Sequence, residues 1–376
     1  MNKAFPRGRR VLILVILAAF GLACVAPAYA AGFASAAPGY RFVFPRDHGP
    51  HPAYQTEWWY YTGRLTSESG RSYGYQLTFF RRGIDAEGVR RNPSKWALKN
   101  VFLAHFAITD ETEKRFTFAE KIRRPGPGSA GAETKAKRLK VWNGQWFAEE
   151  REGIIVLSAV EGSRSVLLRL KPSRPPVIHG RDGVSRKGPG AGQMSHYYSM
   201  TRLDTSGTLT IDGRLETVKG LSWMDHEFGS GQLSEHQIGW DWFGLHLDNG
   251  MDLMLYRIRR ADGTAEPVSS GTLIRPDGST IHLPLEALSY SIRDTWTSPA
   301  TKAVYPSRWV IGVPDHEIEL TITPTLANQE LITTKSTRVT YWEGAVTVKG
   351  RVDGRSVGGS GYVELTGYAG SLGKRF

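Results

Sequence analysis

Apolar and polar side chains alternate with a period of two along much of the chain after residue 40. Between Tyr73 and Phe79, aromatic and aliphatic residues occupy every second position, with glycine or polar residues between them. The same period recurs near Leu209, Val346 and Tyr362. Because successive side chains of a strand point to opposite faces, this period predicts half-buried β-strands.

Turn signals separate these strands at short intervals. Pairs such as Asp212-Gly213 and Asp353-Gly354 favour two-residue hairpins, whose central residues need positive φ angles. The 42 glycines and 11 tryptophans suit antiparallel strands with tight turns, and helix signals are few. The pattern therefore predicts an all-β protein.

The strand pattern occurs twice. Residues 57–61 (EWWYY) and residues 239–243 (GWDWF) each form an aromatic segment that leads through a turn into a strand closing on an arginine. Two tandem copies of one β unit explain this echo. We therefore expect two β-barrel-like domains, over residues 40–230 and residues 231–376.

A second echo relates the closing strands of the two copies. Trp223 and Asp225 stand two residues apart in the first copy, as Tyr362 and Glu364 do in the second. Only the first pair lies in a histidine-rich stretch, so we place the chemistry in the first copy. Residues 171–192 interrupt that copy with Gly, Pro, Lys and Arg and show no apparent secondary structure, and such a loop is either functional or disordered.

The first thirty residues predict a signal peptide. Four basic residues between positions 3 and 10 precede an apolar run at residues 11–23, and Ala28-Tyr29-Ala30 has the small residues of a cleavage site. We expect export, to the periplasm or beyond the cell. Two variants stay open, because Arg9-Arg10 resembles a twin-arginine signal and Cys24 is a poorly placed candidate for lipid anchoring.

Composition excludes cysteine-based sites and makes a nucleic-acid partner unexpected. Cys24 is the only cysteine and lies in the predicted leader, so the mature chain has no disulfide, zinc–thiolate site or cysteine nucleophile. Removing the four basic residues of the leader lowers the formal net charge from +12 to +8. The remaining basic residues are scattered, which is typical of a solvated surface. We expect no nucleic-acid partner, and an anionic membrane surface stays open as a partner.

Reactive side chains are densest between residues 195 and 243, which hold three of the ten histidines. Asp225, His226 and Glu227 are consecutive, so on a strand the two carboxyl groups share one face and His226 has the other. Burial in an aromatic cavity raises the pKa of a carboxyl group, which is then able to donate a proton. The alternative is a structural Asp225 that caps a turn or pairs with an arginine.

His196 and Tyr198 also share one face of a strand, as do Trp223 and Asp225. If these faces meet, an acid lies beside aromatic rings and an imidazole. That arrangement suits protonation of an alkene, because ring faces stabilise the cation that forms. The alternative is a barrel core filled with aromatic side chains.

Other chemistries have weaker support. The histidine spacings match no known metal-binding motif, and no G-x-S-x-G motif stands in the strand–turn–helix setting of a serine hydrolase. Asp225 and Asp241 would suit a glycosidase only at a separation that the sequence does not fix.

Several motifs are spread along the chain: Glu57-Trp58-Trp59-Tyr60, Gly180-Arg181-Asp182-Gly183 with Lys187-Gly188, Ser195-His196-Tyr197-Tyr198-Ser199, Trp223-Met224-Asp225-His226-Glu227-Phe228-Gly229, Gly239-Trp240-Asp241-Trp242-Phe243 and Gly361-Tyr362-Val363-Glu364-Leu365-Thr366-Gly367-Tyr368. Together they resemble the AttH-like branch of the carotenoid hydratase (hydroxyneurosporene synthase) superfamily, over essentially the whole mature chain. The resemblance implies two tandem lipocalin-like antiparallel β-barrels, with a pocket for an apolar, isoprenoid-like ligand near the domain junction.

The resemblance also implies roles for single residues. Hydratase members add water to a terminal isoprenoid double bond without a cofactor, and an aspartate donates the proton. By position, Asp225 is the acid, His196 assists it, and Trp223 and Tyr198 are the aromatics, although Tyr198 stands where tryptophan is expected. We expect no metal or other cofactor. The residues expected to contact the ligand are Trp58, Trp59, Tyr197, Glu227, Trp240, Asp241, Trp242 and Tyr256.

Two hypotheses follow. The chain is either an enzyme that protonates an alkene from Asp225, with water or an internal alkene quenching the cation, or a carrier that holds a lipid-like molecule without changing it. The carrier hypothesis has support from AttH-like proteins that accompany ABC export systems, so an envelope ABC transporter is its expected partner. Others of these proteins are called predicted secreted hydrolases.

Overall fold

The computed structural model describes residues 1, 32–84, 91–94, 97–133, 138–231 and 233–373. All elements below belong to one compact unit, Phe33–Phe376. The predicted signal peptide and Cys24 lie outside the described residues. Within the described part of the chain, no helix is both long and apolar enough to cross a membrane.

The first sheet has thirteen antiparallel strands, in the order β4-β3-β2-β1-β13-β12-β9-β8-β7-β6-β5, with β10 and β11 also paired to β12. One short 3-10 helix, η1 (Arg46–His48), precedes it. The strands are β1 (Thr56–Ser67), β2 (Ser72–Gly83), β3 (Asn100–Asp110), β4 (Arg115–Arg123), β5 (Ala130–Ala132), β6 (Lys140–Asn143), β7 (Trp146–Arg151), β8 (Ile154–Glu161), β9 (Arg164–Pro172), β10 (Val177–Ile178), β11 (Ser185–Arg186), β12 (Met194–Ile211) and β13 (Arg214–Gly229).

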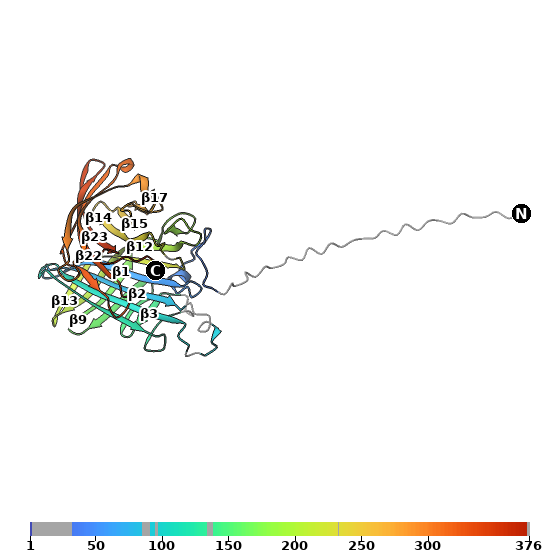
Figure 1. Cartoon of the computed structure of the whole chain (residues 1–376). Coiled ribbons are helices and arrows are strands. Elements are labelled where there is room, and N and C mark those ends of the chain that lie inside the picture. Colours follow the sequence, from blue (N-terminus) through green and yellow to red (C-terminus); the bar gives the residue numbers. More distant parts are fainter. Residues whose placement is uncertain (2–31, 85–90, 95–96, 134–137, 232, 374–376) are drawn as a thin grey trace. The chain divides into compact units, whose positions relative to one another are not determined.

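The second sheet has ten strands, in the order β17-β16-β15-β14-β23-β22-β20-β19-β18, with β21 paired to β22. Figure 1 shows it in yellow to red, beside the blue and green strands of the first sheet. Its elements are β14 (Gln237–Leu247), β15 (Asp252–Arg260), β16 (Ser270–Ile274), β17 (Thr280–Pro284), η2 (Leu285–Ala287), β18 (Ser289–Thr297), β19 (Val304–Val313), η3 (Pro314–His316), β20 (Ile318–Pro324), β21 (Glu330–Ile332), β22 (Thr340–Val352) and β23 (Arg355–Thr366).

The prediction of an all-β protein with two tandem barrel-like sheets is confirmed. The hairpin between β12 and β13 turns at Asp212 (φ 50°) and Gly213 (φ 78°), and the one between β22 and β23 at Asp353 (φ 49°) and Gly354 (φ 70°). Positive φ at both central residues is the conformation that these pairs predict, and it matches the twist of the flanking strands.

The two sheets repeat one pairing scheme. In the first, β1 lies between β2 and β13; in the second, β14 lies between β15 and β23. Asp225 stands opposite Tyr60 across the first ladder, and Glu364 stands opposite Trp242 across the second. The correspondence of Asp225 with Glu364, read from the sequence, therefore also holds in the register.

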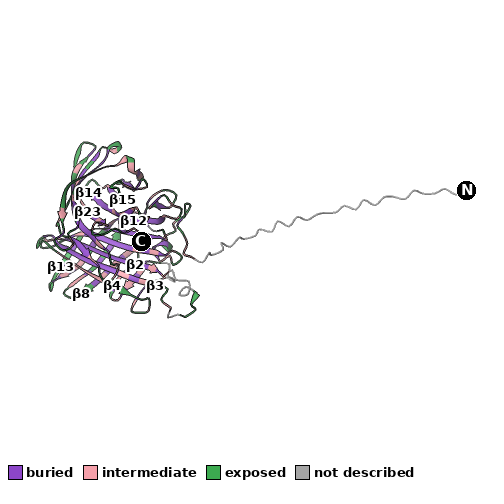
Figure 2. Ribbon diagram, in the orientation of Figure 1, coloured by how far each residue is buried: buried purple, intermediate pink, exposed green. Residues whose placement is uncertain are grey.

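Three apolar clusters hold the fold together. One fills the first sheet around Trp59, Phe79 and Trp146, and another fills the second around Trp309 and Trp342. A third takes buried residues from both sheets, including Tyr60, Tyr197, Trp223, Trp242 and Tyr362. Figure 2 shows the central strands in purple, as buried, and green at the tips of outer hairpins. Burial of large side chains, at about 25 cal/mol per Å² of apolar surface, is the main source of stability, since the described residues include no cysteine that could form a disulfide.

The segment at residues 171–192 differs from expectation. It contains two short strands, β10 and β11, and both pair with β12. His179 follows β10 and Lys187 follows β11. The segment is therefore ordered against the sheet, and it brings two titratable side chains toward the junction.

Candidate active site

A cavity lies where the two sheets meet. Its wall is mostly apolar and takes side chains from β1, β2, β12 and β13 of the first sheet and from β14, β15, β22 and β23 of the second. Its aromatic residues are Trp58, Tyr60, Phe80, Tyr197, Trp240, Trp242, Tyr256 and Tyr341, and its carboxyl groups are those of Asp225, Glu227, Glu343 and Glu364.

Asp225 is buried in this wall and accepts three hydrogen bonds. Tyr197 Oη donates to Oδ2 at 2.6 Å, Trp223 Nε1 donates to Oδ1 at 2.6 Å, and the Ser199 hydroxyl also donates to Oδ1. Burial raises the pKa of Asp225 to about 7, and these hydrogen bonds limit the rise because they favour the anion. Near neutral pH the group therefore exists in both protonation states, as a general acid requires.

Further hydrogen bonds hold two of the donors to Asp225, Tyr197 and Ser199, in position. Trp242 Nε1 donates to Tyr197 Oη at 3.0 Å, so the second sheet supports an acid carried by the first. His179 Nε2 lies 2.7 Å from Ser199 Oγ, and its Nδ1 lies 2.9 Å from Thr272 Oγ1. Burial lowers the pKa of His179 to about 3, so the ring is neutral. Because the Ser199 proton goes to Asp225, Nε2 carries the hydrogen and donates to Ser199.

A second acid faces the same cavity from the other sheet. Glu364 is half-buried and accepts a hydrogen bond from Trp240 Nε1 at 2.9 Å, as Asp225 does from Trp223. Burial, with the charges of Asp225 and Glu227, raises the pKa of Glu364 to about 7 against that hydrogen bond. Burial and the charge of Glu364 raise the pKa of neighbouring Glu343 well above its usual range.

The fourth carboxyl group is paired. Lys187 Nζ lies 2.9 Å from Glu227 Oε1, and Ser195 Oγ donates to the same oxygen at 2.5 Å. The ammonium group also lies 4.6 Å from the ring centre of Tyr256 and 5.2 Å from that of Tyr197. Burial alone would lower the pKa of Lys187, but the charge of Glu227 raises it. The cavity thus already holds one ammonium ion between rings and a carboxylate.

The alternation expected on β13 holds. Asp225 and Glu227 line the cavity, while His226 points to the other face and bonds to Glu57. The expectation that His196 and Tyr198 meet Asp225 is wrong, because on β12 it is Tyr197 and Ser199 that share its face.

His196 and Tyr198 belong to the opposite face. His196 Nδ1 lies 2.8 Å from the carbonyl oxygen of Gly183, and its ring packs on Tyr40. The Tyr198 hydroxyl lies 2.7 Å from His48 Nδ1, within the core of the first sheet. The histidine that reaches Asp225, through Ser199, is therefore His179 and not His196.

Of the residues expected to contact a ligand, some line the cavity and others lie elsewhere. Trp59 points into the first core and stacks on His226, while Asp241 binds Arg259 and Tyr290 inside the second sheet, so neither lines the cavity. Trp223 touches Asp225 beneath the wall. The expected residues that do line it are Trp58, Tyr197, Glu227, Trp240, Trp242 and Tyr256.

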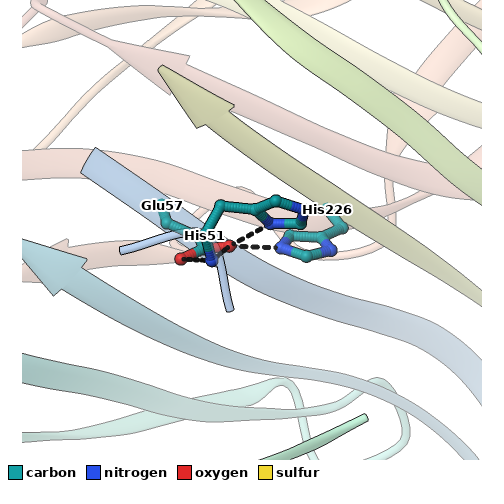
Figure 3. A group of neighbouring side chains, drawn as sticks. All are labelled: His51, Glu57 and His226. Carbon is teal, nitrogen blue, oxygen red and sulfur yellow. Dashed lines mark hydrogen bonds and ion pairs between the residues drawn. The ribbon is translucent and has the colours of Figure 1, made fainter. Parts of the chain in front are cut away.

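A group of side chains behind the cavity has the composition of a metal site. Atoms of His51, Glu57 and His226 lie within 4.8 Å of one another (Figure 3). Both imidazoles hydrogen-bond to Glu57 Oε1, at 2.8 and 2.9 Å, and Arg81 Nε lies 3.0 Å from Oε2. The guanidinium already neutralises the carboxylate, so the group is a buried ion-pair network.

Sequence reasoning gave no site role to five residues that line or support the cavity: Tyr60, His179, Lys187, Glu343 and Glu364. Tyr60 and Glu343 were recoverable, since alternation from Trp58 and from Tyr341 puts them on the cavity face. Lys187 stood in a motif of the resemblance, but its loop, which also carries His179, has no period that would give the direction of either side chain.

Comparison with known proteins agrees with this architecture. A family model described as AttH-like matches residues 35–368. The chain belongs to the AttH-like family. A putative AttH protein of Nitrosomonas europaea, known from its crystal structure, superposes with a TM-score of 0.80 at 35% identity, covering 89% of this chain and 99% of that one.

Two curated relatives of this AttH-like chain carry names of water-adding or water-removing enzymes. Kievitone hydratase of Fusarium solani subsp. phaseoli is 27% identical over 188 residues, or 49% of this chain and 51% of the relative. Dehydratase asqC of Emericella nidulans is 24% identical over 197 residues, or 50% and 54%. The alignments span about half the length of each relative.

Proposed function

We propose that this AttH-like chain is a cofactor-independent enzyme that protonates a carbon–carbon double bond of an apolar, isoprenoid-like ligand in the junction cavity. The observation that carries the proposal is Asp225, a buried carboxyl group on the cavity wall with a pKa raised to about 7. The hydratase and dehydratase names of two relatives support the reaction class.

The reaction has two steps. The proton of Asp225 passes to one alkene carbon and leaves a cation on the other, stabilised by the faces of rings such as Trp58 and Trp242. Water then bonds to the cationic carbon and returns a proton to the Asp225 carboxylate, so the product is an alcohol. If a second double bond of the ligand attacks instead, loss of a proton gives a cyclised product.

Mass spectrometry tests the proposal. The purified protein is incubated with geranylgeraniol and with its own co-purifying extract, and products are compared before and after. We expect a gain of one water, or a shift in retention at unchanged mass for cyclisation. Asp225→Asn should abolish turnover while the protein still retains the ligand. Tyr198→Phe, a change on the other face of β12, should leave turnover intact.

A carrier function predicts retention without change. Turnover by Asp225→Asn equal to that of the wild type would exclude Asp225 as the acid. A ligand that leaves the wild-type protein unaltered would favour a non-catalytic carrier, for which we propose an envelope ABC transporter as partner.

We also propose that the chain is exported, on the composition of residues 1–30. Cell fractionation and amino-terminal sequencing of the mature protein test this.

A further inference from the structure

The junction cavity contains more carboxyl groups than cations. Asp225, Glu227, Glu343 and Glu364 face it, and Lys187 is the ammonium group on its wall. Lys187 pairs with Glu227. Within the part of the chain that the structure describes, the other three carboxyl groups form no salt bridge.

Some buried carboxylates outside the cavity have arginine partners. Glu57 pairs with Arg81 at 3.0 Å, and Asp241 pairs with Arg259 at 2.9 Å. Glu330 instead accepts hydrogen bonds from three hydroxyl groups. An unpaired buried carboxyl group is costly, because burial removes hydration without replacing it. Once these three groups ionise, no side chain among the described residues forms a salt bridge that neutralises their charge.

Two buried oxygen atoms on the cavity wall lack a hydrogen-bond partner among the described residues. Glu343 is 1% exposed and lines the cavity; Tyr60 donates to its Oε1, but its Oε2 has no hydrogen-bond partner among the described residues. The Oε1 atom of Gln76, on the same wall, is also without a partner. A hydrogen-bond donor on a bound ligand would satisfy Gln76 Oε1, and a positive charge would favour the ionised form of Glu343.

The aromatic lining favours the same charge. Cations are attracted to the faces of tryptophan and tyrosine rings, more strongly where water is excluded. Lys187 shows that the cavity accepts an ammonium ion in this way, since it lies between Glu227 and the rings of Tyr197 and Tyr256.

We propose that the junction cavity selects apolar ligands that carry one positive charge, with a hydrophobic ammonium ion as the chemical class of stable ligand. The inference concerns binding and uses the same cavity as the proposed function. A bound ammonium ion would occupy the position of the alkyl cation in that reaction, without being changed.

Binding should be coupled to proton release. The titratable groups around the cavity are Asp225, Glu227, Glu343, Glu364, Lys187 and His105, with the phenols of Tyr60, Tyr197, Tyr256 and Tyr341. The pKa of Asp225 and that of Glu364 are raised to about 7, and that of Glu343 is raised well above its usual range. A cation favours the carboxylate forms, so its binding expels protons near neutral pH.

The test compares two probes of one shape. Benzyltrimethylammonium and neopentylbenzene differ only in nitrogen for carbon at the quaternary centre. Calorimetry and tryptophan fluorescence on the whole mature protein should give at least about tenfold tighter binding of the cation at about pH 8. Its affinity should fall as the pH is lowered to about 6, and calorimetry in buffers of different ionisation enthalpy should report released protons.

Matched variants locate the effect. Glu364→Gln should reduce the preference for the cation, whereas Glu330→Gln, at a buried carboxyl group outside the cavity, should leave it unchanged. Lys187→Met frees Glu227 and should strengthen cation binding. Circular dichroism checks that each variant folds. If a variant does not fold, the comparison of the two probes on the wild-type protein still tests the inference.

Equal or tighter binding of neopentylbenzene at about pH 8, or binding without proton release, overturns the inference. Its failure is separable from that of the proposed function. If the protein hydrates geranylgeraniol but does not prefer the cation, only this inference is contradicted. If it binds the cation but shows no turnover, only the catalytic proposal is contradicted.

Discussion

His179 and Asp225 do not touch, yet one hydroxyl group joins them. His179 Nε2 lies 2.7 Å from Ser199 Oγ, and that hydroxyl donates to Asp225 Oδ1. The link crosses from the loop after β10 to β12 and then to β13. It makes His179 a positioning residue for the acid, although it lies forty-six positions from Asp225 in the sequence.

Replacing His179 by alanine should raise the pKa of Asp225 further, because nothing then holds the Ser199 hydroxyl toward the anion. Unsatisfied Ser199 and Thr272 groups should also cost about 1–3 kcal/mol of stability. Carboxyl carbon NMR with labelled aspartate measures the pKa, and denaturant unfolding measures the cost. His196→Ala is the control, and an Asp225 titration that moves with His196 and not with His179 would contradict the assignment.

Two adjacent tyrosines on β12 give a paired prediction. Tyr197→Phe removes the donor to Asp225 Oδ2, so the pKa of Asp225 should rise and any pH–rate profile of the proposed reaction should move to higher pH. Tyr198→Phe removes a core hydrogen bond to His48 and should cost about 1 kcal/mol of stability without moving that profile. Equal shifts in both variants would show that the two faces of β12 are not distinct.

Glu364 should make stability depend on pH. The pKa of its carboxyl group is about 7 in the folded protein against a usual value of 4.5, so the folded state holds this proton where the unfolded chain has lost it. The contribution is fully present below 4.5 and is lost as the pH rises toward 7.

Glu364→Gln removes this dependence and keeps an acceptor for Trp240. The free energy of unfolding of the variant minus that of the wild type is the quantity to compare. This difference should be more positive at about pH 8 than at about pH 5, by on the order of 2 kcal/mol. Thermal unfolding at the two pH values measures the difference. A constant difference would mean that Glu364 titrates normally.

The fold was largely predictable because its determinants are local. Two-residue periodicity and Asp-Gly pairs specify strands and hairpins, and the echo of residues 57–61 in residues 239–243 specifies the duplication. Alternation also predicted correctly that Asp225 and Glu227 share a face away from His226. These inferences need no knowledge of which strands pair.

The site was less predictable because it depends on register and on a loop. A shift of one residue exchanges Tyr197 for Tyr198, and only the pairing of Ser199 with Asp225 decides which one faces the acid. Glu364 was set aside because its sequence neighbours are not histidines. The histidine that reaches Asp225 comes from residues 171–192, where no period constrains direction.

The buried network behind the cavity supports the last prediction. Burial alone would raise the pKa of Glu57, but hydrogen bonds from His226 and His51 and the charge of Arg81 hold it well below its usual range. The stability that it contributes is therefore present above the usual glutamate pKa and is lost as the pH falls below it. Glu57→Gln leaves Arg81 buried without a counter-ion and should cost about 3–5 kcal/mol at neutral pH.

Two measurements distinguish an ion-pair network at His51, Glu57 and His226 from a metal site formed by the same residues. Because Arg81 already neutralises Glu57, neither EDTA nor added zinc should change the melting temperature of the wild type. The loss in Glu57→Gln should shrink as the pH falls below the usual range of glutamate, since the wild type then loses the same interaction. Stabilisation by zinc that disappears in His51→Ala would instead show that these three side chains bind a metal.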